Sequence, residues 1–418
     1  MNILMINRAL YARSAGEGVM FTVAEELERQ GHHISWFARD DEKNPMLPDS
    51  YVASMPRDDS RAQRKRRLTY DTSAREALRE RLHQDTVDLA LVWQPGSLTW
   101  AVLEALADAW IPTYVMLMDY GPLCLCRNMD RKGHRCTRCM NGSFLSGIIH
   151  RCVQDDRRAS ALAARQETLC RRRRIYDLPW GYISPSDYHR EMMLKACFTT
   201  RPVLSLDLPV AIPPEGEVTG RPGGYFLYVG TMERRRGVAT LLEAMRQAVT
   251  DMPLVMAGDG PDFRELRELA EEMGLLGKVR FLGRLQSVSL RQVIHDCHCL
   301  IVPSECEEIA PWPLLEAQAL GKPALVSNLS VLPERVQDGE NGRVFKAGDP
   351  VMLSQMMDEL ADISPEEYEK MSRCARETAV ARYDLTSYAR RLTELDRYGE
   401  ETGQDMDDLP QDEAEGTV

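Results

Sequence analysis

Short apolar runs alternate with helical patterns along most of this chain, and that alternation restricts the fold more than any other feature. The first run, residues 2–7, has the composition of a buried strand. A glycine-bearing loop follows over residues 12–18, and residues 19–30 place apolar side chains at helical spacing. Gly31 ends that helix, and residues 33–38 begin the next strand. A strand, loop, helix and strand in this order form the repeating unit of a doubly wound parallel sheet.

The same unit recurs in both halves of the chain. A proline- and glycine-rich stretch, residues 208–224, separates the halves and is expected to be a linker. We therefore predict an α/β fold of two doubly wound, Rossmann-like domains facing across a cleft, an N-terminal domain over 1–207 and a C-terminal domain over 225–385. The acidic residues 400–418 are expected to form a disordered tail. Further strands are predicted at 87–93, 112–118, 225–231, 253–258, 279–283 and 299–303.

Length and charge narrow the class of protein. A chain of 418 residues has room for two hydrophobic cores, and its net charge of −12 argues against nucleic acid as the main partner. No apolar run is long enough to span a bilayer, and the first residues do not have the pattern of a signal peptide, so we expect a cytoplasmic protein. Eleven cysteines, an odd count, then indicate reduced thiols or metal ligands.

Two basic runs stand out in this acidic chain, one from Arg61 to Arg67 and one from Arg171 to Arg174. The ordinary interpretation is a solvated helix face. The alternative is a patch that contacts anionic lipid head groups, at the periphery of the inner face of a membrane, or a charged acceptor.

The clearest candidate site lies in residues 303–323. An apolar strand is followed by a loop that carries Glu308 and by a helix that opens at Pro311 and carries Glu316. Free amide groups at a helix N-terminus bind anions, and carboxylates accept hydrogen bonds from sugar or ribose hydroxyls. The stretch therefore predicts a nucleotide-sugar pocket. The alternative is that both glutamates are solvated residues at the end of a helix.

This stretch resembles the Glu-x7-Glu signature of family-four retaining glycosyltransferases, including the Pro-Ser before it and the Leu-Leu-Glu-Ala run within it. The resemblance covers roughly residues 1–395 and implies the two-domain GT-B fold. It also implies that Glu308 contacts the donor sugar, that Glu316 contacts the nucleotide ribose, and that a last helix at 386–399 returns to the N-terminal domain.

The loop from Gly230 to Gly237 resembles the family's Gly-Arg-Leu-x-x-Glu-Lys-Gly loop, whose Arg and Lys hold the donor diphosphate. Arg236 falls on the Lys position. Thr231 falls on the Arg position, which removes one expected charge that Arg234 or Arg235 could supply. Residues 258–261 and 281–284 resemble the family's next two donor loops. The donor-binding residues implied are Gly16, Gly18, Gly230, Thr231, Arg235, Gly237, Gly258, Asp259, Gly260, Leu282, Ile309, Ala310, Pro311, Leu314 and Glu316.

The N-terminal domain departs from the family pattern. Gly16 and Gly18 resemble the family's glycine loop, with Glu17 separating the usual glycine pair. Met118 takes the place where relatives often carry the histidine of a His-Asp pair. Asp119 is a candidate acceptor contact, with a purely structural role as the alternative. The predicted catalytic residues are Glu308, Arg236 and Asp119.

A cysteine-rich insertion, residues 121–152, follows Asp119. Its close Cys-x2-Cys spacing, with more cysteines nearby in a reducing compartment, predicts a structural zinc knuckle. Some relatives carry a similar stretch, which places the chain in a subgroup by resemblance only. Unligated cysteines and an iron–sulfur cluster are the alternatives, and His134 could replace one thiolate. The predicted ligands are Cys124, Cys126, Cys136, Cys139 and Cys152.

Together these features predict an enzyme that moves a sugar from a nucleotide-diphosphate donor to a hydroxyl of a carbohydrate or lipid-linked acceptor, with retention. Arg236 and the helix amides would stabilise the leaving diphosphate, and no catalytic metal is expected. Synthesis of a surface polysaccharide or glycoconjugate is the expected setting. The alternatives are a non-catalytic nucleotide- or carbohydrate-binding protein and a zinc-stabilised interaction scaffold.

Overall fold

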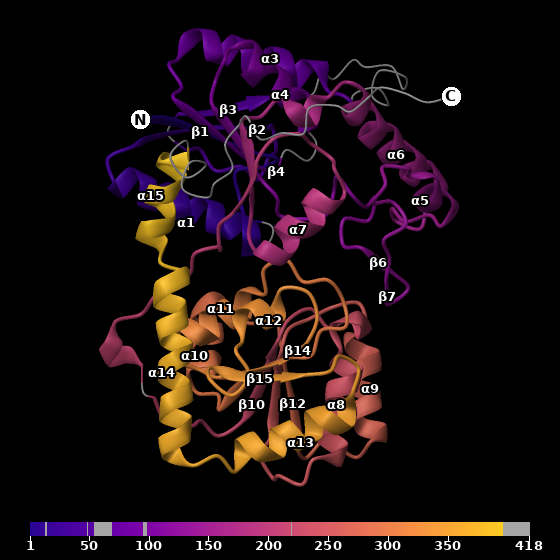
Figure 1. The fold of residues 1–418 in the computed structure, drawn as a ribbon, viewed down its shortest axis with the longest axis vertical. Helices are drawn as coiled ribbons and strands as arrows, with labels where there is room; N and C mark the ends of the chain where they lie inside the picture. The colour runs from indigo at the N-terminus through magenta and orange to yellow at the C-terminus, as the bar shows by residue number, and fades with distance from the viewer. Residues whose placement is uncertain (13–14, 48, 54–68, 95–97, 219, 396–418) are drawn as a thin grey trace, which may run out of the picture.

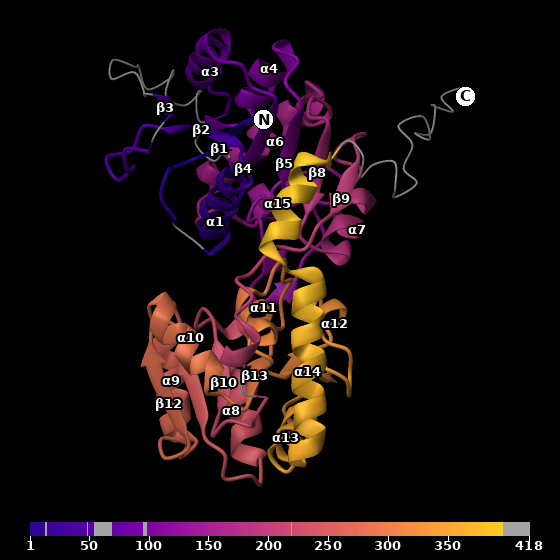
Figure 2. The same cartoon turned by 90° about the vertical axis from the view of Figure 1, so that its left-hand side faces the viewer.

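The computed structural model describes residues 1–12, 15–47, 49–53, 69–94, 98–218 and 220–395. The basic run from Arg61 to Arg67 and the acidic tail at 400–418 lie outside these residues. Two α/β domains are stacked along the long axis of the molecule, and the view in Figure 2 shows the narrow waist between them. No helix in the described part of the chain is both long and apolar enough to cross a membrane.

The N-terminal domain is built on a parallel sheet of seven strands in the order β3-β2-β1-β4-β5-β8-β9. The chain starts in the middle of the sheet, so Ile3 lies opposite Ile34 on one side and Leu89 on the other. Its strands are β1 (Asn2–Asn7), β2 (His33–Arg39), β3 (Ser50–Ala53), β4 (Leu89–Gln94), β5 (Thr113–Met116), β8 (Gly181–Ser184) and β9 (Val203–Ser205). Its helices are α1 (Ala15–Arg29), α3 (Thr72–Gln84), α4 (Ala101–Asp108), α5 (Leu145–Ile149), α6 (Arg157–Arg172) and α7 (Asp187–Lys195), with a 3-10 turn at Ile175–Asp177.

The C-terminal domain repeats this design with a parallel sheet of six strands in the order β12-β11-β10-β13-β14-β15. Its strands are β10 (Phe226–Val229), β11 (Leu254–Ala257), β12 (Val279–Gly283), β13 (Cys299–Val302), β14 (Ala324–Ser327) and β15 (Gly342–Phe345). Its helices are α8 (Val238–Gln247), α9 (Phe263–Glu272), α10 (Ser287–His295), α11 (Trp312–Ala319), α12 (Leu332–Arg335), α13 (Pro350–Ala361) and α14 (Pro365–Arg382), with 3-10 turns at Glu215–Glu217 and Arg234–Arg236.

Both sheets are covered by helices on two faces, which is why their strands are continuous apolar runs. Each face has its own buried cluster. One cluster crosses the waist, because Leu315 of α11 and Tyr383 after α14 pack with residues of the N-terminal sheet and α1. The two-domain fold predicted from the alternation of strands and helices is confirmed.

The C-terminal end of the described chain ties the domains together. Helix α14 runs along the C-terminal domain, and α15 (Leu385–Thr393) then lies beside α1 of the other domain (Figure 1). The side chain of Gln30 donates a 3.0 Å hydrogen bond to the carbonyl of Thr386. At the waist, Asp207 accepts ion pairs from the buried Arg335 and from Arg382.

One local element differs from the prediction. Helix α1 begins at Ala15, so Gly16 and Gly18 lie in its first turn and not in a loop before it. Glu17 is buried there and accepts a 2.8 Å ion pair from Arg8. A carboxylate in the first turn is favoured by the helix dipole, which supports a start earlier than the glycines suggested.

Candidate donor site

Two loops of the C-terminal domain meet where the strand order of its sheet reverses. Strand β10 leads into residues 230–237 and the neighbouring strand β13 leads into residues 303–311. In doubly wound folds, ligands bind at the carboxyl ends of the strands on either side of this reversal. The topology therefore brings together the two motifs that the sequence placed about 70 residues apart, Arg236 and Glu308.

Glu308 and Arg236 form an ion pair at this point. Residue Glu308 is buried, only 5% exposed, and its carboxylate also accepts a 2.6 Å hydrogen bond from Ser304 Oγ. The backbone N–H of Glu308 donates to Ser330 Oγ at 3.0 Å, which fixes the loop. The charge of Glu308 raises the pKa of Arg236, so the guanidinium is held in its charged form beside a carboxylate.

A glycine makes the close approach of these loops possible. Gly237 has φ +70°, and a Cβ there would lie 1.8 Å from the carbonyl oxygen of Pro303. Any side chain would push β13's loop away from Arg236. The packing of the two loops therefore requires glycine at position 237 of this chain.

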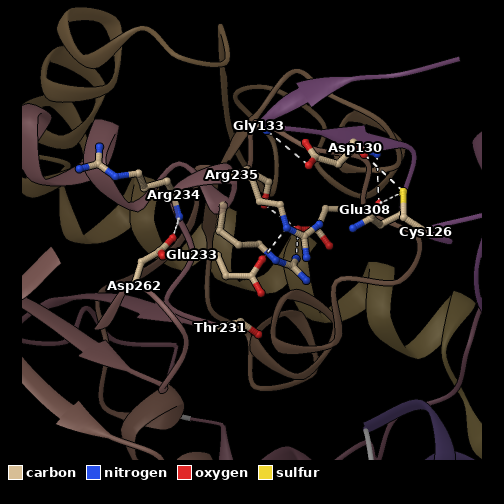
Figure 3. A network of polar contacts seen from close by, with 12 residues as sticks. Cys126, Asp130, Gly133, Thr231, Glu233, Arg234, Arg235, Asp262 and Glu308 are labelled. Carbon is tan, nitrogen blue, oxygen red and sulfur yellow. Dashed lines mark hydrogen bonds and ion pairs between the residues drawn. The ribbon is translucent and has the colours of Figure 1, made fainter. Parts of the chain in front are cut away.

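The other arginines of the loop are directed elsewhere. Arg234 pairs with Glu265 at 2.6 Å, and Figure 3 shows its side chain pointing away from Glu308. Arg235 lies closer to Glu308 in the same view and pairs with Glu233. Thr231 offers no charge, and its carbonyl accepts a 2.8 Å hydrogen bond from Tyr228. Of the two candidates for the missing charge, Arg235 is the better placed.

Glu316 sits one turn inside α11. Its carboxylate accepts a 3.0 Å hydrogen bond from Trp312 Nε1, and burial raises its pKa. The helix begins at Trp312, with Pro311 as its N-cap. The amides of Trp312 and Leu314 donate to the carbonyls of Ala310 and Pro311 at 2.9 and 2.8 Å, and Pro313 has no N–H, so the first-turn amides that the sequence offered to a phosphate have other partners in this structure. Leu314 is fully buried in the core of its own domain, so only its backbone can face a ligand.

The remaining donor-loop residues form the rim of the same sheet edge. Ile309 and Ala310 are partly buried and pack against clusters of the N-terminal domain. The carbonyl of Asp259 accepts from the Met232 amide at 3.1 Å, and this joins residues 258–260 to the loop of Arg236. Gly258 and Gly260 allow that contact because a Cβ on either would meet the backbone of Gly230 or Met232. Leu282 is 37% exposed at the end of β12.

The predicted residues of the N-terminal domain lie after β1, at the start of α1, and after β5. The methyl group of Met118 would lie 2.9 Å from a Cβ on Gly16, so the residue in the histidine position lies against the start of α1. Asp119 accepts a 2.7 Å hydrogen bond from the Gly121 amide and a 3.0 Å ion pair from Arg127. These partners give Asp119 a definite role in holding the cysteine-rich insertion, and its acceptor role stays a prediction.

The structure does not gather the five cysteines into a ligand set for the predicted zinc knuckle. Among the residues that the structure describes, no group of three or more His, Cys, Asp or Glu side chains is placed to hold a metal ion. Cys124 and Cys126 are in contact at 3.2 Å, but the Cys126 thiol donates to Asn128 Oδ1 at 2.9 Å. Cys139 and Cys152 pack in a small apolar cluster that includes Leu125, Phe144 and Ala164. Hydrogen bonding and apolar packing thus occupy thiols that the spacing alone assigned to zinc, and Cys136 is half-buried beside them.

The insertion nevertheless reaches the donor site, which the sequence did not reveal. Its short hairpin, β6 (Asp130–Arg131) and β7 (His134–Arg135), ends in Arg135, which pairs with Glu307 of the other domain. Tyr188 of α7 donates to the same carboxylate at 2.7 Å. Figure 3 shows Asp130 and Gly133 of this hairpin beside Arg235 and Glu308. A contact between domains leaves no signal in local spacing, and only the acidic run at 305–308 hinted at it.

Comparison with solved structures defines the class of fold. The chain superposes on HepE of Anabaena in complex with UDP with a TM-score of 0.67 at 15% identity, over 95% of this chain and 100% of that one. It superposes on the lipopolysaccharide outer core galactosyltransferase WaaB with a TM-score of 0.66 at 16% identity, again over 95% and 100%. The fold is therefore the two-domain GT-B fold.

Sequence comparison finds similarity to one family within the C-terminal half. Residues 218–378 match the family model for glycosyl transferases group 1. The D-rhamnosyltransferase WbpZ of Pseudomonas aeruginosa is 32% identical over 161 residues, 38% of this chain and 40% of that protein. The phosphatidyl-myo-inositol mannosyltransferase of Mycobacterium leprae is 28% identical over 232 residues, 51% of this chain and 59% of that protein. The chain thus spans about two fifths to three fifths of the length of these curated relatives.

Proposed function

We propose that this protein is a group 1 glycosyltransferase that moves a sugar from a nucleotide-diphosphate donor to a hydroxyl of a carbohydrate or lipid-linked acceptor, with retention at the anomeric carbon. The observation that carries the proposal is the ion pair of Arg236 and Glu308 at the strand-order reversal of the C-terminal sheet. The group 1 match over 218–378 includes both residues and the whole of α11.

The arrangement suggests how the reaction would proceed. Cleavage of the sugar–oxygen bond builds negative charge on the leaving diphosphate, and Arg236 with the positive end of the α11 dipole would stabilise it. Glu308 would accept hydrogen bonds from the donor sugar, and Glu316 would accept them from the ribose. Arg236 pairs with Glu308 in this structure, so donor binding would require the guanidinium to turn from the carboxylate to the phosphates.

Several finer assignments belong to the same proposal. The acceptor would enter beside Asp119 and the cysteine-rich insertion, and the setting would be synthesis of a surface polysaccharide or glycoconjugate in the cytoplasm at the periphery of a membrane. The alternative from another class, a binding protein without activity, is favoured by Met118 in the histidine position and Thr231 in the arginine position.

Binding and turnover of the donor test the proposal without knowledge of the acceptor. A panel of nucleotide sugars is screened for a rise in the melting temperature and for release of free nucleotide, because a ligand that binds only the folded state stabilises it. Stabilisation by one nucleotide sugar with slow release supports the transferase. Stabilisation with no release on any hydroxyl acceptor supports the binding protein, and no stabilisation by any nucleotide refutes the donor site.

A structural zinc ion is a separate proposal with less support from the geometry. Metal analysis of protein purified without chelator tests it, together with the Cys136→Ser and Cys139→Ser variants. About one equivalent of zinc in the unaltered protein, lost in both variants, would support it. Protein with no zinc would leave the thiols as packing and hydrogen-bonding groups.

A further inference from the structure

The charge of this chain is distributed very unevenly. Residues 127–174 carry thirteen Lys and Arg and four Asp and Glu, a net charge of +9, in a chain whose total is −12. This segment runs from the cysteine-rich insertion through α5 to the end of α6. An anionic partner is attracted to this cationic region and repelled by the acidic remainder of the surface, so the charge distribution directs such a partner to residues 127–174.

Helix α6 presents part of this charge as a stripe. Arg158, Ala161, Arg165 and Arg172 are exposed, and their spacing of three, four and seven places them on one side of the helix. Among the residues that the structure describes, no carboxylate pairs with Arg165 or Arg172. Most other arginines of the segment are engaged elsewhere, such as Arg135 with Glu307 and Arg127 with Asp119.

Apolar side chains lie beside this stripe. Leu145 and Ile149 of α5 are 63% and 58% exposed, and their spacing of four places them on one side of the helix. Arg165 and Arg172 line a cavity of about 1040 Å³ together with Phe144, Leu145, Ile148 and Leu169. Helices α5 and α6 lie together at the outer edge of the N-terminal domain, near the β6–β7 hairpin (Figure 1).

We propose that the α5–α6 face, defined by Leu145, Ile149, Arg158, Arg165 and Arg172, docks on an anionic lipid surface. The guanidinium groups would contact lipid phosphates while Leu145 and Ile149 insert among the upper acyl chains. Exposed aliphatic residues beside the arginines favour a bilayer over nucleic acid, which would offer them no apolar partner. The inference gives a specific surface to the membrane contact in the proposed function, and it would place a lipid-linked acceptor near the hairpin that contacts the donor site.

Vesicle sedimentation with the full chain tests the inference, with no donor present. Binding to vesicles containing about 30 mol% phosphatidylglycerol is expected, with little binding to pure phosphatidylcholine and a steep loss when salt rises from about 0.05 M to about 0.5 M. Arg165→Glu with Arg172→Glu should weaken binding by about 25-fold or more, since each basic residue near an anionic surface contributes about fivefold. Leu145→Ser with Ile149→Ser should weaken it without changing the salt dependence.

Matched variants on the C-terminal domain serve as controls. Arg264→Glu with Arg267→Glu makes the same charge change on the exposed side of α9, and Val249→Ser with Val288→Ser removes two aliphatic groups that are even more exposed, at 85% each. These pairs should bind vesicles as the unaltered chain does. Equal loss in the control pairs, equal binding to neutral vesicles, absence of binding, or tighter binding to RNA than to vesicles would each overturn the inference. The thermal screen with nucleotide sugars needs no vesicles, so failure of the docking surface and failure of the donor site are separate results.

Discussion

Replacing Glu308 with glutamine should strengthen binding of a nucleoside diphosphate while it abolishes most of the sugar transfer. The carboxylate holds Arg236 in an ion pair, and both groups are largely removed from water, with side-chain exposures of 6% and 30%. A diphosphate must compete with Glu308 for that guanidinium and is also repelled by the carboxylate. Glutamine keeps the shape of the side chain and can still accept a hydrogen bond from Ser304. It removes both the competition for the Arg236 guanidinium and the repulsion of the diphosphate.

The size of the effect follows from the exposure of the pair. Two unit charges about 4 Å apart interact by about 4 kcal/mol at the effective dielectric of a protein surface. The partial exposure of Arg236 and the competing phosphate contacts reduce the difference to about 1 to 2 kcal/mol, or about five- to thirtyfold in dissociation constant. Loss of a group that positions the transferred sugar should lower turnover by about 100-fold or more.

Calorimetry with the nucleoside diphosphate and with the intact nucleotide sugar separates the effect of Glu308 on the diphosphate from its contact with the sugar. The Glu308→Gln variant should gain affinity for the diphosphate and gain less, or lose affinity, for the nucleotide sugar. Glu265→Gln is the matched control, because Glu265 pairs with Arg234 on the side away from Glu308. If Glu308→Gln weakens diphosphate binding, or transfers sugar at a nearly normal rate, then Arg236 and Glu308 do not act as assigned.

Gly237→Ala should destabilise the C-terminal domain by about 3 kcal/mol or more, because its Cβ would lie 1.8 Å from the Pro303 carbonyl oxygen. Gly274 has a similar φ of +72° with open space around it, so Gly274→Ala should cost only about 1 kcal/mol. Equal losses of stability for the two variants in urea unfolding would refute the close-approach argument. Burial raises the pKa of Glu167 from its ordinary 4.5 to about 7, so the folded state prefers the protonated acid and stability should fall by up to about 3 kcal/mol as pH rises from about 4.5 to about 7. Glu167→Gln should flatten that pH dependence of the melting temperature and raise stability at pH about 8, and an unchanged profile would contradict it. Arg135→Ala should leave the buried side chain of Glu307 without its cation, lower stability by about 1 to 2 kcal/mol and reduce sugar transfer more than nucleotide affinity. Arg138 is an exposed arginine of the same insertion, and Arg138→Ala should change none of these three quantities. Equal losses of nucleotide affinity and of transfer would show that the hairpin acts only by supporting the fold of the donor site.

Local patterns in the sequence were sufficient for most of the architecture. A buried parallel strand needs an apolar run, and each such run could be read directly, as for residues 2–7 and β1. The start of α1 was misjudged because two glycines suggested a loop, whereas a buried glutamate paired with Arg8 stabilises the first turn. The resemblance placed Arg236 and Glu308 in one donor site, but their ion pair was found only in the structure.

Contacts between distant segments were not predictable in this way. The five cysteines had the spacing of a metal site, but spacing says nothing of the apolar residues around Cys139 and Cys152 or of the Asn128 oxygen that accepts from Cys126. The bridge from Arg135 to Glu307 joins residues of different domains, and no periodic pattern records it. Arg234 and Arg235 were equivalent candidates until the position of Glu265 separated them.

The contact of the β6–β7 hairpin with the donor site connects that site to the α5–α6 face through a series of covalent and ionic contacts. Arg135 pairs with Glu307, Glu307 is adjacent in sequence to Glu308, and Glu308 holds Arg236. At its other end the hairpin belongs to the same insertion that continues into α5 and α6. A force or charge that shifts the α5–α6 face therefore has a short covalent and ionic route to the carboxylate that competes with the donor for Arg236. If docking on an anionic surface shifts the hairpin, Arg236 would be released more readily on vesicles than in solution, and diphosphate affinity would rise with vesicle binding in the unaltered chain but not in Arg135→Ala.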